Sequence, residues 1–196
     1  MFAINRTKEG ISAYKLDDFG NSITALNEAA RVYRELMAAD GTNRSYSSNM
    51  AYCLGHLGWV LNQTGRQEEA IRAYAEGIER GEALVSTGVW HEPNVIWLAW
   101  NSSGMGGIHL AEGKYAEARP HFDRAIALLE DASRRRGPSE DGAYAERLSE
   151  SYSKLAEAAR GMNDDFAAAN AEETSSAWRE KLPQPSATSL PTSPPR

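Results

Sequence analysis

Residues 57–78 read LGWVLNQTGRQEEAIRAYAEGI, with one glycine inside a predicted helix and a second glycine seven residues later. Before the second glycine, Gly65, the residues Leu54, Leu57 and Leu61 recur at the spacing of one helix face. A second apolar stripe at helical spacing follows Gly65. Because glycine tolerates the left-handed backbone that ends many helices, the pattern predicts two helices joined at Gly65.

The first of these two glycines, Gly58, recurs every 48 residues, with Gly10 before it and Gly106 after it. Large apolar and small residues recur in the same register, in the sets Leu26, Tyr74 and Phe122, and Ala29, Gly77 and Ala125. A glycine inside a helix costs about 1 kcal/mol relative to alanine, so its return in three units indicates a packing requirement. We expect the second helix of each unit to cross the first helix at this glycine.

A looser fourth copy follows the third at an offset of 51 residues. It aligns three residues of the last unit with Phe19, Ser22 and Ala30 of the first, namely Phe166, Ala169 and Ala177. The alternation typical of strands is missing. The sequence therefore predicts an all-α fold, an α-solenoid of antiparallel helix pairs with about 3.5 repeats.

The expected domain covers residues 1–182, in units of about 5–44, 45–92, 93–137 and 143–182. Residues 183–196 form a Pro-, Ser- and Thr-rich tail with five prolines in 14 residues, typical of a disordered or polyproline-like segment. We interpret the tail as a chain terminus or as a ligand for an aromatic-lined module.

Units two and three resemble the tetratricopeptide repeat, whose pattern is Leu-Gly, a large residue, a turn Gly, Ala, an aromatic residue and a second Ala. Unit two carries this pattern at Leu57, Gly58, Leu61, Gly65, Ala70, Tyr74 and Gly77. Unit three carries it at Met105, Gly106, His109, Gly113, Ala118, Phe122 and Ala125. These repeats exceed the family's usual length, as in bacterial and kinesin-light-chain-like arrays, and the proline after the second helix is missing.

The resemblance implies a concave ligand groove lined by the first helix of each unit. The groove positions of this register are Tyr52, Trp59, Asn62, Gln63, Trp100 and Ser103. Tryptophan and tyrosine dominate binding hot spots, and Asn and Gln side chains can bond a peptide backbone. Alternatively, these aromatic residues pack between units, as we expect for Trp90 and Trp97.

The same resemblance predicts that one family-typical ligand does not bind. The family's carboxylate clamp, which holds the C-terminus of chaperone tails, needs Lys and Asn where this chain has Gly55 and Trp59. We therefore expect no binding of a chaperone C-terminal peptide.

Composition excludes several classes of function. A net charge of -6 argues against nucleic-acid binding, and no apolar run approaches the length of a membrane span. The single cysteine, Cys53, forms no internal disulfide and indicates a buried thiol in a reducing compartment. The N-terminal residues lack the pattern of a secretory signal, so we expect a cytoplasmic protein.

Catalytic patterns are weak in this sequence, and we predict no catalytic residues, no metal and no cofactor. His109 and His121 lie on adjoining predicted helices and can approach each other, but a zinc site needs further ligands. A helical metal-dependent enzyme using His109, His121 and Glu112 is the least favoured interpretation.

The favoured function is a non-catalytic interaction module that binds a peptide or protein segment, within a bacterial regulatory or signalling protein. The second interpretation is a self-associating scaffold, which includes a homodimer. Only nine residues precede Gly10, whereas the first helices of later units begin about 13 residues before their glycine. We therefore expect the first unit to lack an N-terminal capping helix, so that its open end packs on a second copy of the chain.

Overall fold

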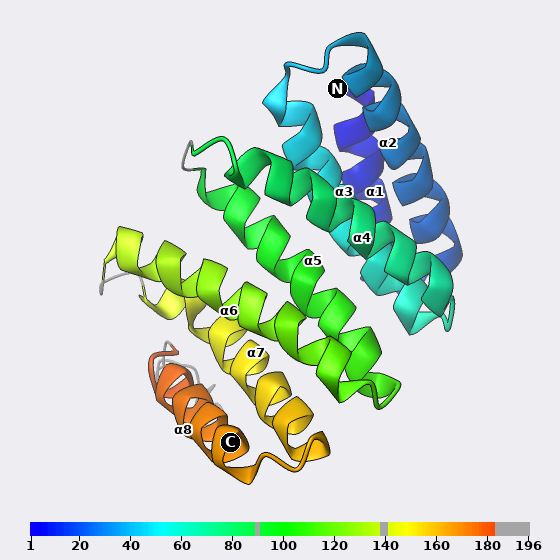
Figure 1. Ribbon diagram of the computed structural model, residues 1–196. Helices are drawn as coiled ribbons and strands as arrows, with labels where there is room; N and C mark the ends of the chain where they lie inside the picture. Colours follow the sequence, from blue (N-terminus) through cyan, green and yellow to red (C-terminus); the bar gives the residue numbers. More distant parts are fainter. Residues whose placement is uncertain (89–90, 138–140, 183–196) are drawn as a thin grey trace, which may run out of the picture.

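The computed structural model describes residues 1–88, 91–137 and 141–182, so the predicted tail at 183–196 and Trp90 lie outside the described residues. Within these ranges the chain forms eight α-helices and no strand (Figure 1). The helices are α1 (Phe2–Tyr14), α2 (Phe19–Ala39), α3 (Arg44–Gln63), α4 (Gln67–Val85), α5 (Glu92–Ala111), α6 (Tyr115–Arg136), α7 (Asp141–Gly161) and α8 (Asp165–Glu180).

Successive helices pack as antiparallel pairs, α1 with α2, α3 with α4, α5 with α6 and α7 with α8 (Figure 1). The second helix of each pair also packs against the first helix of the next pair. We call α1, α3, α5 and α7 the A helices and the others the B helices. The predicted all-α solenoid of helix pairs is confirmed, and its first A helix is short, with 13 residues against 20 in α3 and α5.

The recurring glycines lie where the two helices of a pair cross, as predicted. A Cβ added to each would lie 2.6–2.9 Å from a side chain of the paired B helix, Gly10 against Leu26, Gly58 against Tyr74 and Gly106 against Phe122. Such distances are too short for real contacts. Gly58 therefore admits the ring of Tyr74, which is 2% exposed.

The turn inside each pair uses one left-handed residue. Gly65 and Gly113 have φ values of 74° and 72°, and the first and fourth units use Asp17 and Asn163, both at 60°. Asp and Asn adopt this conformation more readily than most other residues, so the same turn forms without glycine.

The fourth unit differs from its predicted register by one residue, because α8 begins 50 rather than 51 residues after α6. Ala168 is therefore buried, while the predicted Ala169 is exposed, and Phe166 is 79% exposed. Ala156, fully buried, stands at the position of the recurring glycine. The α8 position equivalent to Tyr74 and Phe122 is Glu172, which is exposed. No aromatic ring therefore packs against residue 156, and a glycine is not required at that position.

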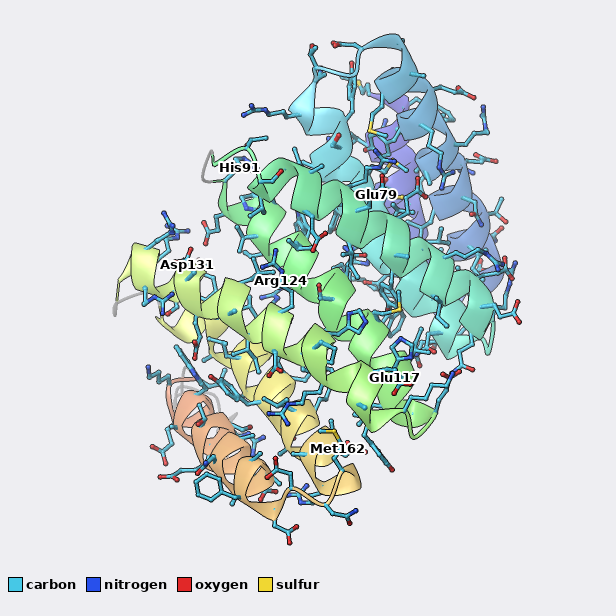
Figure 2. All side chains as sticks on the ribbon, in the orientation of Figure 1. Glu79, His91, Glu117, Arg124, Asp131 and Met162 are labelled. Carbon is cyan, nitrogen blue, oxygen red and sulfur yellow. The ribbon has the colours of Figure 1, made fainter. Side chains whose placement is uncertain are left out.

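The core continues along the whole array in layers between the A and B helices. One apolar cluster joins α1 to α5 and another joins α4 to α8, so the two overlap at α4 and α5. Cys53 is completely buried in the first cluster, and this burial raises the pKa of its thiol to about 12. Charged side chains such as Glu79 and Arg124 are exposed on the B helices (Figure 2). None of the described helices combines the length and apolar character needed to span a membrane.

Candidate functional site

Four rings from two A helices form a continuous cluster, here called the aromatic wall. Tyr52 and His56 come from α3, and Trp97 and Trp100 come from α5. The ring centroids are 4.4 Å apart for Tyr52–Trp97 and His56–Trp100, 4.6 Å for Tyr52–His56 and 6.1 Å for Trp97–Trp100. Spacings of three and four residues place each pair on one helix face, so the two faces meet ring against ring.

Close packing of α3 against α5 holds the wall in place. Gly55 makes this possible, because a Cβ there would lie 3.1 Å from Cε3 of Trp100. The buried Asn101 side chain donates from Nδ2 to the carbonyl oxygens of Ala51, at 3.0 Å, and Trp97, at 2.8 Å. The first of these bonds ties α5 directly to α3.

The wall forms one side of a pocket of about 400 Å³, which we call the A-face pocket. Its lining consists of Tyr52, His56, Trp97, Trp100, Glu146, Arg147 and Glu150, all from A helices. The last three belong to α7 and are exposed. Glu150 accepts a hydrogen bond from Lys154 at 2.6 Å, whereas Glu146 and Arg147 form no ion pair within the described ranges. The pocket thus sets an apolar surface against charged groups.

The wall itself is uncharged at neutral pH. Burial, with a smaller contribution from the positive charge of Lys15, lowers the pKa of His56 to about 3. The imidazole is 7% exposed, and within the described chain its Nδ1 atom has no hydrogen-bond partner. Burial also raises the pKa of Tyr52. His56 therefore acts as a neutral aromatic side chain between Tyr52 and Trp100.

The structure places only some of the six predicted groove residues in the A-face pocket. Tyr52 and Trp100 line the A-face pocket, whereas the other four do not. Trp59 packs against Tyr14 of α1 at 5.0 Å between ring centroids, and Tyr14 is 5.6 Å from His56. The remaining three lie elsewhere on the A helices, with Asn62 and Ser103 half-buried and Gln63 exposed.

Five residues of this pocket were not predicted from the sequence. Trp97 was expected to be a packing residue, and no site role was predicted for His56, Glu146, Arg147 or Glu150. The three-residue spacing between Trp97 and Trp100 was a usable signal, because it places both rings on one helix face. The charged residues of α7 required the correct register of the fourth unit.

The two histidines of the enzyme interpretation do approach each other. The rings of His109 and His121 stack with centroids 5.6 Å apart and an angle of 18° between their planes. Nδ1 of His109 lies 4.0 Å from Glu112 Oε2, and Lys114 pairs with the same carboxylate at 2.8 Å. Burial and the nearby His109 lower the pKa of His121. In the part of the chain that the structure describes, no three His, Cys, Asp or Glu side chains are grouped to hold a metal ion.

Comparison with known proteins confirms the tetratricopeptide resemblance. The tetratricopeptide repeat family model matches residues 50–88. The crystal structure of BtubC (BKLC) from P. vanneervenii has a TM-score of 0.60 at 16% identity, over 93% of this chain and 69% of that chain. The crystal structure of MamA has a TM-score of 0.36 at 15% identity, over 88% and 95%. No curated protein sequence matches the chain. The similarity to BtubC supports the solenoid fold.

Proposed function

Since residues 50–88 match the tetratricopeptide repeat, a unit that in general mediates protein interactions, we propose that this chain binds a peptide or protein segment in the A-face pocket. The observation that carries this proposal is a half-exposed aromatic surface that faces charged groups across an open pocket. The proposal includes a regulatory or signalling role in a bacterial cytoplasm.

Three rings of the wall have the properties of binding anchors. Tyr52, Trp97 and Trp100 are partly exposed, and such side chains bury a large area with few rotatable bonds. Their mutual contacts and the Asn101 hydrogen bonds hold them in place before a ligand arrives. A preorganised surface loses little conformational entropy on binding, which favours affinity.

The charged side chains of α7 would orient a segment that binds in the pocket. Glu146 and Glu150 offer carboxylates, and Arg147 offers a guanidinium, at positions open to solvent. Charged groups at the edge of an interface contribute more to association rate and specificity than to affinity. A bound segment would therefore be anchored by the wall and aligned by α7.

The test replaces Trp97 and Trp100 with alanine in the full chain and measures capture of partners from a lysate of the source organism. We expect the captured partner to bind at least about 30-fold more weakly, because hot-spot truncations cost 2 kcal/mol or more. Trp59→Ala is the matched control, since Trp59 packs outside the pocket. Equal capture by the double variant and the wild type, with helicity preserved, would contradict the proposal.

Self-association is a second candidate, favoured by exposed apolar side chains at both ends of α1. Phe2 is 58% exposed, Ile4 is 42% exposed, and Leu16, just beyond this helix, is 80% exposed. Two copies that covered these side chains would form a scaffold. Sedimentation should then show a dimer at micromolar concentration that Phe2→Asp abolishes. A monomer at high micromolar concentration would exclude this candidate.

A further inference from the structure

We propose that the chain's own Pro-rich segment, residues 183–196, is a ligand of the A-face pocket. This proposal rests on the function proposed above and gives its ligand a chemical class, a proline-rich segment with a basic residue. It also implies that a partner segment competes with the chain's own residues for the aromatic wall.

The sequence of the segment carries the chemistry that such a pocket would recognise. It reads PQPSATSLPTSPPR and contains no Asp or Glu. A polyproline II helix has three residues per turn, so Pro191 and Pro194 would share one edge. Segments of the PxxP type dock in aromatic-lined grooves with a small entropy cost. Arg196 follows two residues after Pro194 and supplies one positive charge.

The pocket offers a complementary surface to each of these features. The half-buried rings of Trp97 and Trp100, 6.1 Å apart, present flat apolar surfaces for two prolines. Glu146 and Glu150 provide two carboxylates on the opposite side, beside the guanidinium of Arg147, and Glu150 also pairs with Lys154. Glu146 forms no ion pair within the described ranges, so it is the carboxylate most open to a positive charge on a ligand. A guanidinium such as that of Arg196 pairs strongly with carboxylates through charge-assisted hydrogen bonds.

The helix that precedes the segment packs against the helix that carries the charged side of the pocket. The last helix, α8, packs antiparallel to α7, and Ser175 Oγ donates to the carbonyl oxygen of Ser149 at 2.7 Å. Ser149 lies between the two pocket carboxylates on α7. Beyond Leu182, 14 residues at about 3.1 Å each can extend roughly 40 Å. A tether of this length gives an effective concentration on the order of millimolar.

The first experiment records the indole N–H signals of the five tryptophans by NMR in the full chain. Pro191→Ala/Pro194→Ala is compared with wild type, and Pro183→Ala/Pro185→Ala is the matched control. We expect the signals of Trp97 and Trp100 to shift in the first variant, while Trp59 stays unchanged in both. Addition of a synthetic peptide of residues 183–196 should return the shifted signals toward their wild-type positions.

The second experiment titrates the same peptide, labelled with a fluorophore, into the full-length Pro191→Ala/Pro194→Ala chain. With Glu146→Gln/Glu150→Gln added, we expect about threefold weaker binding. Glu117→Gln on α6, labelled in Figure 2 and outside the pocket, is the control and should change nothing. These exposed substitutions leave the aromatic wall intact.

Two results would overturn the inference. One is identical Trp97 and Trp100 signals in wild type and in the Pro191→Ala/Pro194→Ala chain. The other is a signal shift that depends on protein concentration, which would assign the contact to a second copy. If either result occurs while Trp97→Ala/Trp100→Ala still abolishes partner capture, the proposed function stands and only the identity of this ligand fails. If partner capture survives that double variant as well, both fail.

Discussion

Two seams between A helices, built from equivalent positions, have different structures. Between α3 and α5 the seam is closed, because Trp100 lies over Gly55 and Asn101 bonds to the backbone of Ala51. Between α5 and α7 the helices are less closely joined, and their seam opens into the A-face pocket. One array of similar units thus contains both a closed and an open seam.

The repeat register explains the difference. In the second seam, Ser103 occupies the position of Gly55, and Glu150 occupies the position of Trp100. A short exposed carboxylate replaces the ring that fills the first seam, so space remains beside the aromatic wall. A candidate binding site in this solenoid therefore lies where one unit lacks the residue that closes its neighbour.

The largest expected effect comes from breaking the closed seam at Gly77. A Cβ at this position would overlap Oδ1 of the buried Asn101, so Gly77→Ala displaces the side chain that ties α5 to α3. We expect a loss of about 3 kcal/mol in unfolding free energy, or roughly 6–12 °C in Tm. Gly107→Ala on α5 meets no neighbour within 4 Å and should stabilise slightly. Scanning calorimetry of both variants and the wild type measures the change in Tm. Equal behaviour of the two variants would refute the packing explanation.

A smaller loss of stability is expected at low pH, and it comes from His56 in the aromatic wall. The pKa of about 3 in the folded chain lies below the unfolded value of about 6.5, so the unfolded state binds the proton more tightly. Stability is therefore complete above pH 6.5 and falls as the pH drops toward 3. Between pH 7.5 and pH 5 this amounts to about 2 kcal/mol. Urea unfolding at both pH values should show the loss in wild type, and His56→Phe should lose about 2 kcal/mol less.

Closing the open seam should weaken binding with little change in stability. Ser103→Gly/Glu150→Trp recreates the closed arrangement between α5 and α7 and places a ring in the A-face pocket. We expect binding of the captured partner to fall at least about tenfold, while unfolding free energy changes by about 1 kcal/mol or less. A variant that binds the partner as tightly as wild type would show that the pocket is not the site.

The smallest effect concerns a ligand of related proteins. Gly55 is covered by Trp100, and neither Gly55 nor Trp59 can supply the Lys and Asn of a carboxylate clamp. A titration with a chaperone C-terminal peptide, followed by calorimetry, should therefore give no heat of binding. Micromolar affinity for that peptide would contradict the expectation.

The fold was predictable because its signal repeats. Gly58 and its counterparts are each opposed by a large side chain 16 residues later, and this coupling appears in the sequence as a common register. Gly77 shows the limit of such reasoning. It was assigned to a small-residue position, but only the structure reveals that Asn101 of the next unit occupies the space beside it.

Only two of the seven residues that line the A-face pocket were predicted from the sequence. Tyr52 and Trp100 follow from the register. The three-residue spacing places Trp97 on the face of Trp100, but its contact with Tyr52 depends on how closely α3 approaches α5, which the sequence of one helix does not specify. The charged side was missed for a simpler reason. The predicted register aligned only the second helix of the fourth unit, at an offset of 51, and assigned no equivalent of Trp100 in its first helix. The true offset of 50 makes that residue Glu150. The aromatic residue that marks the register in units two and three, Tyr74 or Phe122, is replaced by Glu172 in the fourth unit.

Site-specific photo-crosslinking in source cells tests the central claim most directly. One chain carries p-benzoylphenylalanine in place of Arg147 in the A-face pocket, and the other carries it in place of Glu79, exposed on α4 (Figure 2). Mass spectrometry then identifies the polypeptide joined to each position. We predict adducts with a peptide segment, from a partner or from residues 183–196, at position 147 and none at position 79. Adducts at position 79 alone, or in equal yield at both positions, would contradict the assignment of this pocket as the binding site.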